Sequence, residues 1–339
     1  MDMLQPTTAP VGRLLRLGVV LDTRNPVERL HEVARMCDRA GIGALWVEDP
    51  RAAPGDPAQL EAWTALTLVA PEVRRARLGA LLDAGWRDPA LLARMAATLA
   101  ASVGGRLELT LRAGGAAAGD LGGIVEALRR ELVATWIPSV VSSGSGGPIL
   151  EAVALPAEQP TIAVAVPPAR AADLEWAARI ADDLVLPPAP FAATLEAAAA
   201  ARQAAARAGR DPAQLGIAAR LPVSVGRTGA EAQARWDAEP AFAGLGRSDE
   251  AGIFGTLEQC HDRVVALAHA GVTDLRCLLP NAIDIHDVIA QLTAMTIGSA
   301  GKLVPGAPRT RVPEPPPGWG GRPRFPQPPS GPQPPAAAG

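Results

Sequence analysis

The sequence predicts a closed (β/α)8 barrel, in which eight parallel strands are each followed by a helix. Short apolar runs alternate with longer, Ala-rich segments of helical period between residues 14 and 303. Each run is nearly continuous in apolar character, as expected for strands buried on both faces of a parallel sheet. Eight such units in about 290 residues also fit the usual size of this barrel.

The predicted strands and helices follow from these patterns in chain order. The strands are Leu17–Leu21, Ala44–Val47, Leu78–Leu82, Leu107–Leu111, Ile162–Val166, Asp183–Leu186, Leu221–Val225 and Leu275–Leu279. Predicted helices are Val27–Ala40, Pro57–Ala70, Pro89–Ser102, Ala169–Ile180, Phe191–Ala208 and Leu257–Ala270. A capping side chain before a proline favours a helix start. This pair occurs at Asn25-Pro26, Asp56-Pro57, Asp88-Pro89 and Asp211-Pro212.

A doubly wound open sheet is the main alternative fold. That fold usually carries a Gly-x-Gly-x-x-Gly turn after its first strand, where the backbone approaches a dinucleotide. The segment from Leu21 to Pro26 contains no glycine. The sequence therefore favours the barrel.

The composition divides the chain into a folded body, residues 1–303, and a Pro-rich tail, residues 304–339. The tail holds 13 of the 34 prolines in 36 residues. Proline removes backbone donors and favours extended polyproline structure, so we expect the tail to be disordered. The Ser142–Pro148 stretch is interpreted as a loop within the body, because the alternating pattern resumes after it.

Charge and cysteine content exclude several classes of function. The formal net charge is −3, which argues against a nucleic-acid binder or an anionic-membrane binder. Lys302 is the only lysine, so Schiff-base and P-loop chemistry are disfavoured. Three cysteines make no disulfide framework, and no stretch of about 18 apolar residues predicts a membrane span. These features predict a cytoplasmic protein.

Acidic residues follow the first three predicted strands. Asp22 ends the first strand, Glu48 and Asp49 end the second, and Asp83 ends the third. Catalytic groups of such barrels lie at the C-terminal strand ends, so these four carboxylates are the candidates for proton handling. For Glu48 and Asp49, a role as loop caps is an equally supported interpretation. Trp86, just beyond, either walls a flat ring or packs within its loop.

The fourth strand leads into a glycine-containing loop. It ends at Arg112, and Ala113, Gly114 and Gly115 follow. Glycines between a strand and a helix let backbone N–H groups approach a phosphate, and an arginine adds positive charge. The fifth strand instead ends at Pro167-Pro168, which removes two such N–H donors.

The histidines do not form a metal-binding pattern. His31, His261 and His269 fall inside predicted helices, and His286 follows Asp284. No His-x-His or Cys-x-x-Cys pair is present, whereas a metal-dependent barrel hydrolase needs several ligands at its strand ends. We expect structural histidines and no metal.

The order of motifs resembles the luciferase-like monooxygenase superfamily. The matching segments are Ala40–Asp49, Glu61–Leu66, Arg77–Gly79, Asp88–Ala93, Ala97–Leu99, Gly105–Leu109, Ala177–Asp183, Gly255–Gln259 and Ala270–Arg276. The resemblance implies a (β/α)8 barrel that uses FMN or a deazaflavin (coenzyme F-420), acts on a small organic substrate and forms a homodimer. By position, it implies that the cofactor contacts Arg112, Ala113, Gly114 and Gly115. Its ring is expected to lie against a strained bulge at the end of the third strand, which brings in Leu81 and Leu82.

The chain also departs from the family pattern at four places. The segment between the fourth and fifth strands is short and lacks the usual aromatic-rich helix. Pro50 stands where many deazaflavin-dependent relatives have a histidine, and Gly115 replaces a glutamate acid. Pro167-Pro168 replaces a glycine pair. Two hypotheses therefore stand side by side: an oxidoreductase that uses hydride transfer or flavin-mediated oxygenation, and a catalytically degenerate barrel that binds a cofactor or a partner.

Overall fold

The computed structural model describes residues 15–50, 58–113, 120–136, 160–165, 171–280 and 285–297. Its strands are β1 (Arg16–Val20), β2 (Ala44–Glu48), β3 (Arg77–Asp83), β4 (Leu107–Arg112), β5 (Thr161–Ala165), β6 (Asp183–Leu186), β7 (Gly216–Gly226), β8 (Ile253–Thr256) and β9 (Asp274–Leu278). The α-helices are α1 (Val27–Ala40), α2 (Ala62–Val69), α3 (Pro89–Ser102), α4 (Leu121–Trp136), α5 (Ala171–Ile180), α6 (Phe191–Arg207), α7 (Gly229–Asp237), α8 (Ser248–Ala251), α9 (Leu257–His269) and α10 (Ile285–Ile297). Short 3-10 helices are η1 (Ala70–Glu72), η2 (Ala84–Trp86), η4 (Pro212–Gln214) and η5 (Pro240–Phe242).

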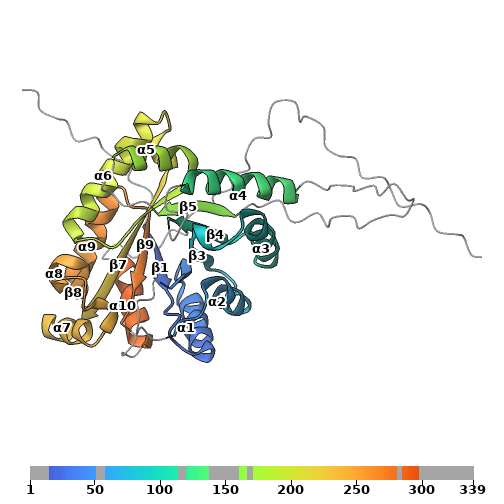
Figure 1. Ribbon diagram of the computed structural model, residues 1–339. Coiled ribbons are helices and arrows are strands. Elements are labelled where there is room, and N and C mark those ends of the chain that lie inside the picture. The colour runs from blue at the N-terminus through green and yellow to red at the C-terminus, as the bar shows by residue number, and fades with distance from the viewer. Residues whose placement is uncertain are drawn as a thin grey trace, which may run out of the picture. The chain divides into compact units, whose positions relative to one another are not determined.

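The described strands close into a parallel barrel, which confirms the predicted fold. Strands β1 to β7 pair in chain order, and β9 lies between β7 and β1. The β6–β7 pairing, with Asp183 opposite Gly216, belongs to this ring. Because parallel neighbours need a crossover connection, helices follow the strands and lie around the outside of the sheet (Figure 1).

Strand β7 is longer than predicted, and β8 is absent from the prediction. The predicted run Leu221–Val225 covers only the second half of β7, whose first half pairs with β6 and β9. The last four residues, Val223–Gly226, continue beyond the β9 pairing and pair with β8. Gly216–Arg220 follows an Ala-rich helix and is itself rich in alanine and glycine, so its apolar pattern does not distinguish it as a strand.

The helix starts confirm one of the proline-based predictions and correct two others. The Asp88 side chain caps α3 by accepting from two backbone N–H groups, as predicted. Asn25 does not cap α1; its side-chain amide donates to the carbonyl of Asp22 instead. Asp211 caps a 3-10 turn rather than an α-helix. Asp56-Pro57 lies outside the described residues, and α2 is capped by Glu61.

Apolar side chains on the outer face of the strands form the main core with the helices. Leu45, Leu78 and Leu109 are fully buried there, together with alanines of α3, α5 and α6. Small alanine side chains let these helices approach the sheet closely. The alternation along each strand sends every second residue into the barrel interior.

Trp46 occupies the barrel interior. Its ring takes the space that side chains at Gly79 and Gly18 would need, because a Cβ atom at Gly79 would lie 1.9 Å from the ring and one at Gly18 would lie 2.9 Å away. The guanidinium carbon of Arg276 lies 3.5 Å from the ring centroid, which is a cation–π contact. The interior therefore differs from the layers of branched apolar residues that usually fill such barrels.

Charged residues fill the N-terminal end of the barrel interior. Arg276 donates to Glu108 at 2.8 Å, Arg16 donates to Glu108 at 3.2 Å, and Arg16 also pairs with Asp274. Glu108 is completely buried and Arg276 is 2% exposed. Burial raises the pKa of Glu108, while the two arginines oppose this shift. This end of the barrel is a closed, ion-paired structure.

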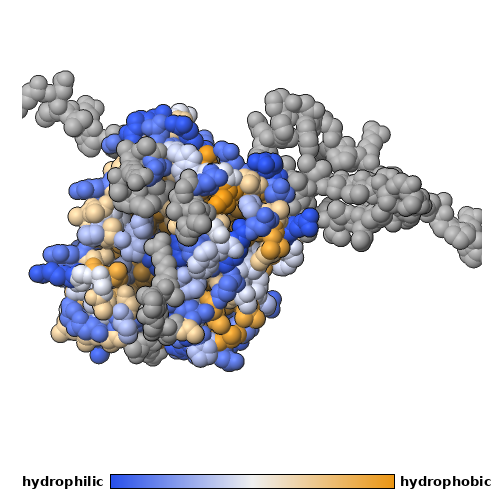
Figure 2. All heavy atoms as spheres, viewed as in Figure 1, coloured by the Kyte–Doolittle hydropathy of each residue, from blue (hydrophilic) through white to orange (hydrophobic). Residues whose placement is uncertain are grey.

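The exposed face drawn in Figure 2 intersperses hydrophilic and hydrophobic residues over the described part. No described helix is long and apolar enough to cross a bilayer. The predicted tail, residues 304–339, and the predicted Ser142–Pro148 loop lie outside the described residues.

Candidate active site at the strand ends

The four predicted carboxylates lie at the same end of the barrel, because parallel strands end together. Each accepts hydrogen bonds from an arginine, which lies two positions away for Asp22 and between 29 and 172 positions away for the other three. The pairs are Asp22 with Arg24, Glu48 with Arg220, Asp49 with Arg87, and Asp83 with Arg112. In the described part of the C-terminal rim, each predicted carboxylate is therefore matched by an arginine.

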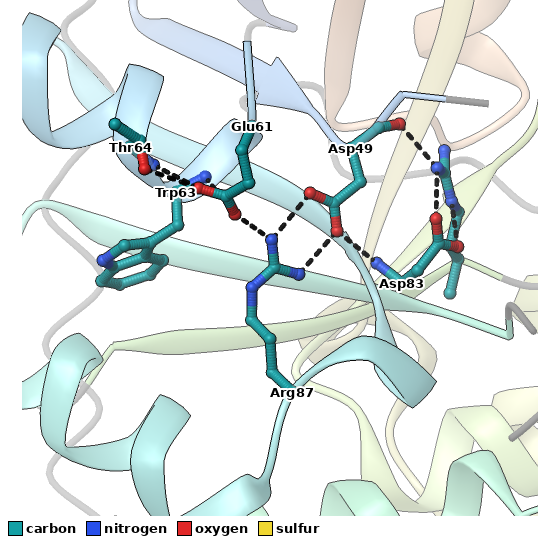
Figure 3. Close-up of polar contacts among 7 residues, drawn as sticks. Asp49, Glu61, Trp63, Thr64, Asp83 and Arg87 are labelled. Atoms are coloured by element: carbon teal, nitrogen blue, oxygen red, sulfur yellow. Dashed lines mark hydrogen bonds and ion pairs between the residues drawn. The ribbon is translucent and has the colours of Figure 1, made fainter. Parts of the chain in front are cut away.

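Arg87 joins the ends of β2 and β3 (Figure 3). Its Nη1 lies 2.6 Å from Asp49 Oδ2, its Nη2 lies 2.8 Å from Asp49 Oδ1, and Nη2 also contacts Glu61. Asp49 Oδ2 accepts in addition from the backbone N–H of Asp83 at 2.8 Å. The Asp49 carboxylate thus accepts hydrogen bonds from the backbone of β3 and from one guanidinium, and its side chain has no exposed surface.

Arg112 makes the next pair along the rim. Its Nε and Nη2 donate to the two oxygens of Asp83 at 2.7 and 2.8 Å, and Nη2 donates to the carbonyl of Asp49 at 2.7 Å. Both side chains are buried. Bidentate bonds of this kind fix the position of both partners. Arg112 and Asp83 therefore brace the rim, and two of the Arg112 nitrogens are already engaged by the protein.

Glu48 and Arg220 form a pair with more contact to solvent. Arg220 Nε and Nη2 donate to the two oxygens of Glu48 across the barrel, from β7 to β2. The side chains are 15% and 21% exposed, whereas that of Asp49 is 0% exposed. Among the predicted carboxylates, Glu48 and Asp22, whose side chains are 15% and 17% exposed, keep contact with solvent, whereas Asp49 and Asp83 are buried.

Asp22 is linked to a second region through Arg24. Arg24 Nε lies 2.9 Å from Asp22 Oδ1, and its Nη2 lies 3.1 Å from Glu239 Oε1. The Asp22 bond raises the pKa of Arg24, against partial burial, so this guanidinium stays charged. The end of β1 is thereby connected to the segment between β7 and β8.

The residues predicted to contact the cofactor do not all lie at the rim with the four carboxylates. Leu81 is 4% exposed and follows the interior alternation of β3, whereas Leu82 packs in the outer core. Ala113 is exposed at the rim, and Gly114 and Gly115 lie outside the described residues. β3 keeps regular pairing with β4 up to Asp83, so the expected bulge is not present in this strand.

Trp86 lies on η2 and is 52% exposed. It stands between Asp83 and Arg87, both of which are fixed by the rim network.

The residues that sequence analysis missed are Arg87, Arg220 and Glu61. Arg87 lies four positions after the end of β3, so a search for basic residues near strand ends finds it. Such a search does not find Arg220, because Arg220 lies just before the predicted strand Leu221–Val225.

Cysteine and histidine chemistry receives no structural support at the rim. Burial raises the pKa of Cys37 and of Cys260 to about 12, so these thiols stay protonated. His31 lies in α1 and His261 in α9, as predicted, and both bond to backbone carbonyls. Among the described residues, no three His, Cys, Asp or Glu side chains come together as a metal site.

The sequence profile of the luciferase-like monooxygenase family matches residues 14–251. This match spans most of the barrel described above. The chain belongs to the luciferase-like monooxygenase family. No curated protein sequence matches it significantly.

Solved structures share the fold of this luciferase-like chain. A coenzyme F-420-dependent tetrahydromethanopterin reductase from Methanopyrus kandleri has a TM-score of 0.62 at 16% identity, over 83% of this chain and 97% of that one. A monooxygenase from Streptomyces bottropensis has a TM-score of 0.65 at 18% identity, over 83% and 98%. An F-420-dependent secondary alcohol dehydrogenase, solved with an F-420–acetone adduct, gives 0.63 at 15% identity, over 84% and 98%.

Proposed function

We propose that the chain is a luciferase-like oxidoreductase that holds reduced FMN or the deazaflavin F-420 at the C-terminal mouth and acts on a small organic substrate. The observation that carries this proposal is the rim of arginine–carboxylate pairs at the ends of β1 to β4, in a barrel that matches the family profile. Similar folds include an F-420-dependent reductase and a riboflavin lyase that was solved with modified FMN, as their names state.

The chemistry of the rim residues fits a flavin-type ring. The pyrimidine edge of such a ring carries both carbonyl oxygens and N–H groups, so it needs donors and acceptors together. Arg220 and Glu48 supply this combination, with part of each side chain exposed. Ala113, with the loop that it begins, is the proposed contact beyond β4.

When bound, the reduced cofactor would supply the hydride, or in the case of FMN the ring carbon that reacts with oxygen. The residues of the chain orient the reactants and move protons. Glu48 is the proposed proton-handling group, because its side chain is partly exposed and pairs with Arg220 across the barrel interior, whereas the similarly exposed Asp22 pairs with Arg24 two positions away. Asp49 and Asp83 are proposed as positioning residues, since their side chains are buried and arginines and a backbone N–H engage their oxygens. Asp22 is proposed to act through Arg24.

The test is a titration of the purified protein with FMN and with F-420, each in oxidised and reduced form, followed by absorbance and calorimetry. We expect one of the two to bind with a micromolar Kd. Arg220→Met should weaken this binding about tenfold, because it removes a charged donor from the mouth. Arg29→Met, on the surface of α1, removes the same charge and is the matched control. Lack of binding by either cofactor at high micromolar concentration overturns the proposal.

The location and assembly of the protein are part of the same proposal. Its three cysteines are buried and unpaired, as is usual for a protein of the reducing cytoplasm. We propose a cytoplasmic homodimer, following the family resemblance. Sedimentation of the purified protein tests the dimer, since a monomer at micromolar concentration contradicts it.

A further inference from the structure

The segment between β7 and β8 is an addition to the barrel. The ring of β1 to β7 and β9 closes without it, and among the described strands β8 pairs only with β7, at the end that extends past β9. The added segment contains α7, η5 and α8, which lie together beside β8 (Figure 1). An insertion at the C-terminal end of a barrel strand lies on the side where ligands bind.

An aromatic cluster, separate from the main core, holds this insertion together. The ring centroids of Trp236 and Phe242 are 4.8 Å apart, and those of Trp236 and Phe254 are 6.2 Å apart in an edge-to-face arrangement. Leu278, the last residue of β9, packs against the same cluster. The cluster therefore reaches the end of a barrel strand.

A cleft of about 620 Å³ adjoins these rings, of which Phe254 is partly exposed, whereas Trp236 and Phe242 are only 5% and 2% exposed. Its lining includes all three aromatic residues and three carboxylates, Asp237, Glu239 and Asp249, against a single arginine, Arg247. A volume of this size is typical of small-molecule sites. The combination of aromatic rings and excess negative charge is the chemistry that recognises organic cations.

The partners of the three carboxylates differ in charge. Asp249 is paired with Arg247 at 2.9 Å. Glu239 is 2% exposed and shares Arg24 with Asp22, so one guanidinium serves two carboxylates. Asp237 is exposed and accepts a hydrogen bond of 2.7 Å from the neutral amide of Gln233. The cleft thus keeps a net negative charge, and Asp237 carries the part of it that is accessible to a ligand.

We infer that this cleft binds a small organic cation with an apolar body, such as an alkylammonium compound. Phe254, the partly exposed ring, contacts the apolar body and the ammonium methyl groups with Trp236 and Phe242 buried behind it, and Asp237 supplies the opposite charge. Binding requires only the insertion, so this inference is independent of the flavin or deazaflavin.

The experiment titrates the full chain, without flavin, with choline and with its neutral isostere 3,3-dimethylbutan-1-ol, by calorimetry. The two probes have the same shape, and only choline carries a charge. We expect choline to bind about tenfold more tightly than the alcohol, and the difference to shrink at high salt. Equal affinity for the two probes, or no binding of choline at about 50 mM, overturns the inference; this ceiling lies above the millimolar Kd of a weak small-ligand site.

Two conservative variants locate the site. Asp237→Asn should weaken choline binding about fivefold, because it removes the accessible charge, and should leave binding of the alcohol unchanged. Phe254→Leu should weaken binding of choline by about the same factor through loss of the aromatic face. Glu196→Gln is the control, because it removes the same charge from an exposed position on α6 that does not line the cleft. Unchanged choline affinity in both folded cleft variants would show that the cation does not bind in this cleft.

Discussion

The two ends of the barrel interior use the same ion pair in different surroundings. At the N-terminal end, Glu108 and Arg276 have side chains that are 0% and 2% exposed. At the C-terminal end, Glu48 and Arg220 are 15% and 21% exposed. A buried pair is costly to break because the remaining charge stays without solvent, whereas an accessible pair exchanges partners with water or a ligand at low cost. The difference in burial thus separates a structural end from an end that can bind.

The largest effect is expected from Glu108→Leu. This change leaves the Arg276 guanidinium buried without its carboxylate, so the free energy of unfolding should fall by about 3–5 kcal/mol. Glu48→Leu makes the same substitution at the open end and should cost about 1 kcal/mol or less. Urea unfolding of both variants measures the contrast. Equal losses would show that burial does not separate the two ends.

Gly79→Ala tests the packing above the buried charges. A Cβ atom at this position would lie 1.9 Å from the Trp46 ring, so the ring and its Arg276 contact have to shift. We expect a loss of about 1–3 kcal/mol in the free energy of unfolding, which thermal unfolding detects. Gly229→Ala is the control, since a Cβ atom there meets no atom within 4 Å. A neutral Gly79→Ala would mean that the interior is loosely packed.

Arg87→Met tests whether the rim network supports binding. The buried Asp49 carboxylate loses both guanidinium bonds and keeps the N–H of Asp83, so a stability loss of about 1–3 kcal/mol is expected. The Kd of the proposed cofactor should rise about tenfold, as the ends of β2 and β3 lose their common contact. Arg87→Lys keeps the charge without the bidentate geometry, so its stability and its cofactor Kd should lie between those of the wild type and Arg87→Met. Loss of stability with an unchanged cofactor Kd would assign Arg87 to the fold alone.

Asp38 offers a smaller and pH-dependent test near the N-terminal end of β3. Burial opposes its ionisation, but backbone N–H groups of residues 74–76 bond to its carboxylate at 2.8–3.2 Å and lower its pKa. Its stabilising contribution is therefore complete above its ordinary pKa of about 3.9 and is lost as the pH falls through the lower folded value. Asp38→Asn should cost about 1 kcal/mol at pH 7, and its difference from the wild type should shrink below about pH 4. A constant difference across this range would exclude the ionised carboxylate as the cause.

The sequence determined the barrel, because its strands are continuous apolar runs and its helices are separated from them by clear turns. It also placed Asp22, Glu48, Asp49 and Asp83 at one rim, since parallel strand ends meet there whatever their spacing in the chain. The family order of motifs added the expectation of a flavin-type cofactor, which the family profile supports.

Only the tertiary structure decided which arginines Glu48 and Glu108 meet, whereas Arg24 lies two positions from Asp22 in the sequence. Arg220 lies 172 positions from Glu48, and Arg276 lies 168 positions from Glu108, so no local sequence pattern predicts either pair. The aromatic cleft has the same origin, because it depends on the fold of a short insertion around Trp236. Strand periodicity is a local property of the chain, whereas ion pairing across a barrel and the shape of a cleft depend on how closure brings distant residues together.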